Sequence, residues 1–288
     1  MAKITFRDPI TKSLIMEHEI QKWHFSQETE FQQVDVFESV EFGMTLALGG
    51  VVNVTERDEV GYHEMLAHVP LLSHPDPKRV LIIGGGDGGT LREVVKHSCV
   101  EEAVMVEIDE VVVNVCKEYL PECASAFDHE KANLIIGDGL KYVEEAESES
   151  FDIILVDSTD PVDAAVELFT ESFYKECHRV LKPGGVLVPQ SDAVFHYGKR
   201  VHDIVKKLRN IYDSVDCYLS FVTGYPSGVW TFSYASKGGH PTEQIDEARF
   251  KEIEPTLKYY STDLHRAAFV LPKSYQRCIE EGVEVGKG

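Results

Sequence analysis

A run of glycines directly after a buried-looking strand is the feature that most constrains the fold of this chain. The apolar residues Val80–Ile83 lead into the loop, and the helix-like stretch Thr90–Lys96 leaves it. Gly84, Gly86 and Gly89 follow the GxGxxG pattern, in which glycines allow a tight turn and a close approach to a ligand. Strand, loop and helix in this order predict a site for a nucleotide-type cofactor.

The same loop contains an acidic residue, Asp87. A carboxylate at this place repels a pyrophosphate and attracts a cation. We therefore expect an adenosine cofactor that carries a positive charge, such as a sulfonium.

From residue 78 onward, short apolar runs alternate with helix-like stretches. We predict strands at residues 80–83, 103–106, 133–136, 151–156, 186–188, 214–222 and 229–235. We predict helices at residues 91–97, 110–119, 170–181 and 199–211, and a turn at 182–185. This alternation is typical of an α/β fold, with a parallel sheet covered by helices on both faces.

The first 75 residues have a different pattern. Phe31–Phe37 alternates apolar and polar side chains, and short strands are predicted at 45–48 and 51–54 around the turn at Gly49-Gly50. A helix is predicted at 59–72, and His74–Pro77 then breaks the pattern. We expect a small N-terminal antiparallel β-domain over residues 1–75 and the α/β domain over residues 76–288.

Acidic residues follow four consecutive predicted strands of the α/β domain. Asp87 follows the first strand, and Glu107 lies about 20 residues beyond the loop, where a carboxylate accepts both ribose hydroxyls. Asp138 follows the third strand, and Asp157 and Asp160 follow the fourth. Ligands bind at this edge of open α/β sheets. The spacing suits NAD and adenosyl-sulfonium cofactors equally, and each acid also has a structural interpretation as a helix cap or turn residue.

The net negative charge of the chain limits the kinds of molecule that it is expected to bind. The chain has 49 acidic and 28 basic residues and a net charge of −21, which opposes binding to nucleic acid and anionic membranes. It favours cationic small molecules, although acidity also serves solubility alone. The six cysteines form no CxxC pair, and we find neither an apolar leader nor a run of about 20 apolar residues. We expect a cytoplasmic protein with no membrane partner.

No metal site is predicted. His63 and His68 form an HExxxH pattern, and histidines five residues apart do not share a helix face. An acidic cleft suits a cationic donor and a cationic amine acceptor. Because an ammonium has no lone pair, the amine must lose a proton before it attacks, and a carboxylate can take that proton.

In addition to these features, the chain resembles the spermidine synthases, or putrescine aminopropyltransferases. The resemblance covers nearly the whole chain and is carried by residues 31–32, 38–43, 55–59, 62–71, 80–91, 105–109, 157–161, 168–170, 223–228, 258–260 and 267–272. It implies a Rossmann-like methyltransferase-type domain behind the N-terminal β-domain. It also implies a homodimer or homotetramer and no prosthetic group.

The reaction implied by the resemblance uses decarboxylated S-adenosylmethionine as co-substrate. Its aminopropyl arm moves to putrescine, and the products are spermidine and 5′-methylthioadenosine. The donor-binding residues implied are Gln32, His63, Gly84, Gly86, Asp87, Glu107, Asp138, Gly139 and Ala164. Within this set, Asp87 and His63 hold the aminopropyl end, Glu107 binds the ribose, and Asp138 and Gly139 contact the adenine.

The resemblance implies that Asp157 is the catalytic proton acceptor and that Tyr62 lies beside it. The acceptor-binding residues implied are Tyr62, Asp157, Ser158, Thr159, Asp160, Asp192 and Tyr225. Asp192 is expected to reach the far amine through water. His63 also has an interpretation as a structural histidine.

One segment departs from the family pattern Asp-Pro-x-Gly-Pro-Ala. Here the chain has Asp160-Pro161-Val162-Asp163-Ala164-Ala165, which puts the adenine contact at Ala164 in doubt. The departure is either loop drift or the mark of another acceptor, such as agmatine, cadaverine or a longer polyamine. Two further alternatives are an S-adenosylmethionine methyltransferase and a non-catalytic polyamine-binding protein.

Overall fold

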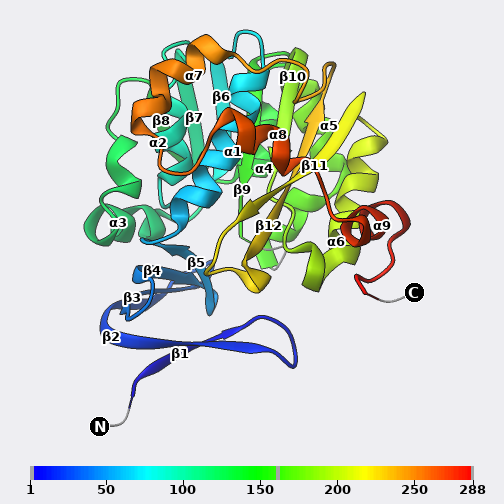
Figure 1. The fold of residues 1–288 in the computed structure, drawn as a ribbon. Coiled ribbons are helices and arrows are strands. Elements are labelled where there is room, and N and C mark those ends of the chain that lie inside the picture. Colours follow the sequence, from blue (N-terminus) through cyan, green and yellow to red (C-terminus); the bar gives the residue numbers. More distant parts are fainter. Residues whose placement is uncertain (1–2, 160–162, 287–288) are drawn as a thin grey trace.

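The chain forms two β-sheets with helices around the larger one, and the computed structural model describes residues 3–159 and 163–286 (Figure 1). The smaller sheet is antiparallel, with its strands in chain order. These strands are β1 (Thr5–Pro9), β2 (Ile15–Glu28), β3 (Gln33–Ser39), β4 (Gly43–Leu48) and β5 (Val51–Thr55). Gly49 and Gly50 turn the chain between β4 and β5 with φ of +59° and +82°, which glycine adopts without strain. The predicted antiparallel β-domain is therefore confirmed, although β1 and β2 were not predicted.

The larger sheet has the strand order β11-β12-β10-β9-β6-β7-β8. Its strands are β6 (Arg79–Gly84), β7 (Glu102–Glu107), β8 (Ala132–Ile136), β9 (Phe151–Asp157), β10 (Leu181–Pro189), β11 (Ser214–Phe221) and β12 (Val229–Ser236). Strands β8, β7, β6, β9 and β10 are parallel, as predicted, whereas β12 pairs antiparallel with both β10 and the edge strand β11. The strand order reverses between β6 and β9, and at such a switch point a crevice opens beyond the strand ends.

Helices cover both faces of this sheet, as expected. The helices are α1 (Glu59–Ser73), α2 (Gly89–Val95), α3 (Glu110–Tyr119), α4 (Gly139–Glu145), α5 (Glu171–Val180), α6 (Val194–Arg209), α7 (Glu247–Ile253), α8 (Thr262–Ala268) and α9 (Lys273–Glu281). Side chains of α1, α2 and α3 pack with Ile82 and Leu155 on one face. Side chains of α4, α5 and α6 pack with Ile83 and Val156 on the other. Neighbouring residues of these strands point alternately into the two cores. Because both sets are buried, the strands are continuous apolar runs.

Two local predictions need correction, and four helices were missed. The turn predicted at 182–185 lies within β10, where the pairing with β9 shifts register between Leu181 and Val186 and Gly184 has φ of +77°. Helix α6 begins at Val194, five residues before the predicted start. Helices α4, α7, α8 and α9 were not predicted. In the part of the chain that the structure covers, no helix is both long enough and apolar enough to cross a membrane.

Candidate active site

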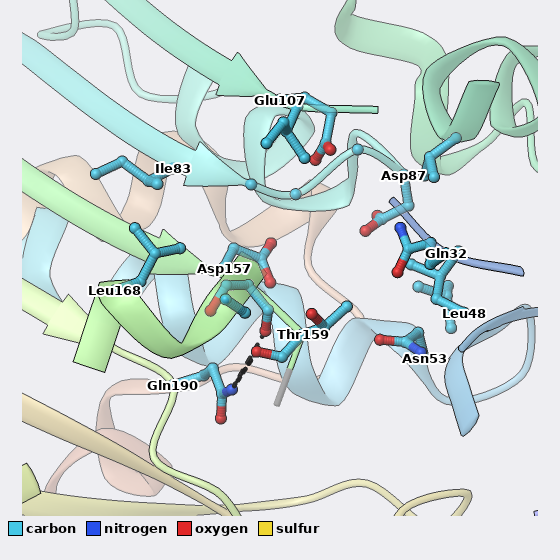
Figure 2. Close-up of a pocket in the computed structure, with 18 of the residues that line it drawn as sticks. Gln32, Leu48, Asn53, Ile83, Asp87, Glu107, Asp157, Thr159, Leu168 and Gln190 are labelled. Carbon is cyan, nitrogen blue, oxygen red and sulfur yellow. Dashed lines mark hydrogen bonds between the residues drawn. The ribbon is translucent and has the colours of Figure 1, made fainter. Parts of the chain in front are cut away.

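A cavity of about 490 Å³ lies at the carboxyl ends of the parallel strands, where the N-terminal sheet faces them. Figure 2 shows Asp87, Glu107 and Asp157 around it, with Gln32, Leu48 and Asn53 on one side and Ile83 and Leu168 on the other. Most of the residues predicted for the site line this one cavity. They are Gln32, Tyr62, His63, Gly84, Gly86, Asp87, Glu107, Asp138, Gly139, Asp157, Ser158, Thr159 and Tyr225.

The glycine loop is in direct contact with the strand that carries Asp157. Gly84 pairs with Asp157 in the sheet, and the backbone N–H of Gly85 donates to the Asp157 carbonyl at 2.7 Å. Gly84 has φ of +81°, and a Cβ there would lie 2.3 Å from that carbonyl oxygen. A Cβ on Gly86 would lie 2.9 Å from Oε2 of Glu107. Glycine is therefore required at position 84 by its backbone conformation and the Asp157 carbonyl, whereas at position 86 a side chain would crowd Val112 and Glu107.

Glu107 is buried at the end of β7. Its Oε1 accepts a hydrogen bond from the backbone N–H of Asp109 at 2.8 Å. Burial raises the pKa of Glu107 to about 7, because the backbone hydrogen bonds only partly offset the loss of water. Asp109, and not Glu107, caps α3 by accepting from Val111 N–H at 3.0 Å. Glu107 is thus a buried acceptor that lines the cavity and does not cap the helix.

Asp138 combines a structural role with its place in the cavity lining. Its Oδ1 caps α4 by accepting from the N–H groups of Leu140 at 2.9 Å and Lys141 at 3.4 Å. Gly139 follows it, and a Cβ there would lie 2.5 Å from Cγ2 of Ile83. The glycine is therefore needed for packing against β6.

The Asp157 carboxylate is held by two hydroxyl groups. Tyr62 on α1 donates to its Oδ1 at 2.8 Å, and Thr90 on α2 donates to its Oδ2 at 2.5 Å. Burial and the charge of Asp87 raise the pKa of Asp157, while His63 and the two hydroxyls act in the opposite direction. Burial and Asp157 raise the pKa of Tyr62 well above its usual range, so Tyr62 keeps its proton and acts as a donor. Thr90 was not predicted, since the sequence has no signal for a contact across 67 residues.

His63 lies between two carboxylates. Its Nδ1 is 2.6 Å from Oε2 of Glu59, and its Nε2 is 3.2 Å from Oδ1 of Asp87. Burial lowers the pKa of His63, but Asp87 and Glu59 outweigh it and raise that pKa well above the usual range. His63, Asp87 and Asp157 place ligand-type atoms within 4.8 Å of one another. A ring protonated on both nitrogens has no lone pair for a metal, so this cluster does not favour a metal ion.

The other side of the cavity is aromatic and amide-lined. Tyr225 meets the ring of Tyr62 edge-on at 5.8 Å, and its hydroxyl donates to the Asn53 carbonyl. Gln190, which sequence reasoning missed, donates from Nε2 to the carbonyls of Ser158 at 3.2 Å and Thr159 at 3.4 Å (Figure 2). Gln190 therefore fixes the backbone that follows Asp157.

Three predicted residues are not brought into the described lining. Asp192 accepts from the backbone N–H of Ala193 at 2.7 Å and pairs with Arg200. Asp160 lies outside the described residues, as does the side chain of Ala164. The roles predicted for these three residues stay predictions.

Comparison with known proteins gives one consistent result. The family model of the spermine/spermidine synthase domain matches residues 59–247, and that of the spermidine synthase tetramerisation domain matches residues 4–56. A polyamine aminopropyltransferase of Bacillus cytotoxicus is 44% identical over 271 residues, which cover 94% of this chain and 97% of the relative. One of Caldicellulosiruptor bescii is 42% identical over 278 residues, covering 96% and 99%.

Two solved structures are similar throughout. A crystal structure of spermidine synthase in complex with the transition-state analogue AdoDATO superimposes with a TM-score of 0.93 at 37% identity, covering 96% of this chain and 94% of the other. The structure of spermidine synthase from Thermotoga maritima gives a TM-score of 0.91 at 37% identity, with the same coverage.

Proposed function

This chain belongs to the spermine/spermidine synthase family and is an enzyme of the polyamine aminopropyltransferase type, and we propose that it transfers the aminopropyl group of decarboxylated S-adenosylmethionine to putrescine. The observation that carries this proposal is the placement of Asp157. Its carboxylate is held by two hydroxyls in the same cavity as Glu107 and Asp87. The groups proposed as proton acceptor, ribose acceptor and ammonium-binding group thus line one cavity.

In the proposed donor complex, Glu107 accepts hydrogen bonds from the ribose hydroxyls, and Asp138 and Gly139 lie against the adenine. Gln32 contacts the methylthioadenosine portion from the opposite wall. The aminopropyl ammonium lies against Asp87, whose Oδ1 is already fixed by the backbone N–H of Gly89 at 2.7 Å. Because Asp87 is already held in one orientation, donor binding loses less side-chain entropy.

The proposed reaction is a direct displacement. The amine lone pair attacks the carbon next to the sulfonium, a C–N bond forms, and the C–S bond breaks with its electron pair moving to sulfur. Sulfur becomes a neutral thioether in methylthioadenosine. One proton passes from the acceptor ammonium to Asp157, which frees the lone pair that attacks. Until it takes this proton, the negative carboxylate stabilises the positive charge on that nitrogen.

For the acceptor, we propose that Tyr62, Tyr225, Ser158, Thr159 and Asp160 form the binding region. Asp163 and Ala164 distinguish this chain from the family pattern next to that region. Agmatine, cadaverine or a longer polyamine is accordingly the second candidate acceptor. A methyltransferase is disfavoured, since Asp87 opposes the carboxylate that ordinary S-adenosylmethionine retains.

We also propose that the N-terminal sheet joins copies of the chain into a homodimer or homotetramer. Its match to a tetramerisation domain supports this, and so do its exposed apolar side chains. These side chains are Ile4, Leu14, Ile15, Trp23 and Val40. Light scattering on the purified protein measures the copy number, and a monomer would contradict the proposal.

The decisive experiment is incubation with decarboxylated S-adenosylmethionine and a panel of amines, followed by identification of the products by mass. We expect spermidine and methylthioadenosine from putrescine. Asp157→Asn is expected to bind the donor as the wild type does and to lose most of its turnover. Near-normal turnover in that variant would show that another group accepts the proton.

A further inference from the structure

A continuous chain of buried polar groups leads away from the active site into the interface between α1 and α2. Asp87 contacts His63 at 3.2 Å, and His63 contacts Glu59 at 2.6 Å. Arg92 donates a hydrogen bond to each carboxylate oxygen of Glu59, from Nη1 to Oε1 at 3.1 Å and from Nη2 to Oε2 at 2.8 Å. Its Nε donates to Glu93 at 2.7 Å. None of Glu59, Arg92 and Glu93 lines the cavity as it is described.

The geometry requires hydrogens on both nitrogens of His63. Each nitrogen faces a carboxylate oxygen, and an ionised carboxylate only accepts hydrogen bonds. The His63 side chain is 2% exposed and that of Glu59 is 5% exposed, so water does not replace either partner. An uncompensated charge in such a place is costly, and each member of the chain therefore depends on the next.

We propose that Glu59 and Arg92 are positioning residues of the reaction, which hold His63 as a doubly hydrogen-bonded cation so that Asp87 and Asp157 share one buried positive charge before substrate binds. This inference rests on the proposed function of the same site. Arg92 fixes Glu59 through the two parallel N–H groups of its planar guanidinium, and Glu59 fixes the His63 ring and its protons. His63 then orients Asp87 towards the donor and weakens the mutual repulsion of the two active-site acids.

The electrostatic surroundings support this arrangement. Asp87 faces His63 from the loop after β6, Asp157 from the end of β9, Glu59 and Tyr62 from α1, and Arg92 from α2. Cys123, from the short 3-10 helix Cys123–Ala126, lies near Asp87, Glu59 and Arg92, and Cys116 on α3 lies near Asp87. Burial raises the pKa of Glu59, but hydrogen bonds and charges of His63 and Arg92 outweigh it and lower that pKa to about 2. Glu59 is thus ionised at neutral pH.

Loss of the Glu59 charge is expected to raise the pKa of Asp157. His63 then keeps only one of its two carboxylate partners, and its pKa falls. A neutral His63 no longer lowers the pKa of Asp157, which burial and Asp87 already raise. The acid limb of the kcat profile, which reports protonation of the base, should therefore move to higher pH by about one unit or more.

The test is the pH dependence of kcat at saturating donor and amine in the wild type, Glu59→Gln and Arg92→Lys. Glu59→Gln keeps the shape and an acceptor oxygen, and Arg92→Lys keeps the charge but loses the planar guanidinium. We expect an upward shift of about one pH unit in Glu59→Gln and a smaller shift in the same direction in Arg92→Lys.

Glu64→Gln is the matched control. Glu64 follows His63 on the same helix and is 1% exposed, but its carboxylate accepts from the backbone N–H groups of residues 258–260. The acid limb of the kcat profile of Glu64→Gln should lie at the wild-type pH, even if the melting temperature of this variant falls. An unmoved limb in folded Glu59→Gln overturns the proposal, as does an equal shift in Glu64→Gln.

Where Glu59→Gln does not fold, Arg92→Lys decides the question by the same measurement. An unmoved limb in folded Arg92→Lys then overturns the proposal. Failure of the proposed function would look different, because the wild type itself would then release no methylthioadenosine with any amine.

Discussion

Replacing Asp87 by asparagine tests how the glycine loop selects its donor. Asp87 is 7% exposed, its Oδ1 accepts from Gly89 N–H at 2.7 Å, and the same oxygen is 3.2 Å from His63. Asparagine keeps the size and the Gly89 hydrogen bond and removes only the charge. We expect Asp87→Asn to weaken the binding of decarboxylated S-adenosylmethionine specifically.

The magnitude follows from the charges at the site. An ammonium at about 4 Å from a carboxylate gains roughly 4 kcal/mol at an effective dielectric constant near 20. His63 already shares this carboxylate, so we take about half of that value, about 2 kcal/mol, which is roughly a thirtyfold increase in Kd. Ordinary S-adenosylmethionine retains a carboxylate that Asp87 opposes, so removing the charge of Asp87 should leave its Kd unchanged or lower it.

The assay is isothermal titration of the wild type and Asp87→Asn with three ligands. These are decarboxylated S-adenosylmethionine, ordinary S-adenosylmethionine, and methylthioadenosine, which has no aminopropyl arm. Asp152→Asn is the matched control, because Asp152 is also a buried acid of the same sheet but binds Lys78, Arg79 and Lys182 at the start of β9. A loss of methylthioadenosine affinity as large as that of the donor would refute the reasoning, since it would mean that Asp87 only supports the loop.

Three other changes have expected outcomes. Thr90→Val removes a hydrogen bond to an ionised acceptor, worth about 1.5–3 kcal/mol, so the acid limb of kcat should rise by one to two pH units, and Thr90→Ser should restore it. Glu107 has a folded pKa of about 7, so its contribution to stability is present at low pH and lost as pH rises towards 7. Glu107→Gln should therefore raise the melting temperature of the ligand-free protein at pH 8 while abolishing donor binding, and a lower melting temperature would contradict this. Gly89→Ala would place a Cβ 2.3 Å from the His63 ring, so donor affinity should fall at least tenfold by titration, and an unchanged affinity would count against the assigned contact.

The fold was predicted best where the chain is buried on both sides. Strands β6 and β9 are apolar along their length because both faces of the sheet are covered, and such runs stand out in a sequence. Strand β2 was missed because most of its side chains are exposed or half-buried, so it has no clear alternation. Helix α4 was missed because it has only 7 residues, two of them buried.

The site was predicted where its residues follow strands. Glu107 and Asp157 stand at strand ends, and parallel topology brings those ends to one edge. Thr90, Glu59 and Arg92 were missed because their contacts depend on how α1 and α2 pack, for example across 33 residues between Glu59 and Arg92. No periodicity in the sequence encodes such a contact.

The pairing of β6 with β9 separates what this protein can change from what it must keep. Gly84 and Asp157 are partners in adjacent strands, so the glycine loop and the proposed proton acceptor are held by the same sheet. The proposed acceptor-binding residues, in contrast, include Asp160, which precedes the positions Asp163 and Ala164 where the sequence departs from the family pattern. We therefore expect substitutions at Asp163 and Ala164 to change the preferred amine without moving Asp157 relative to the glycine loop.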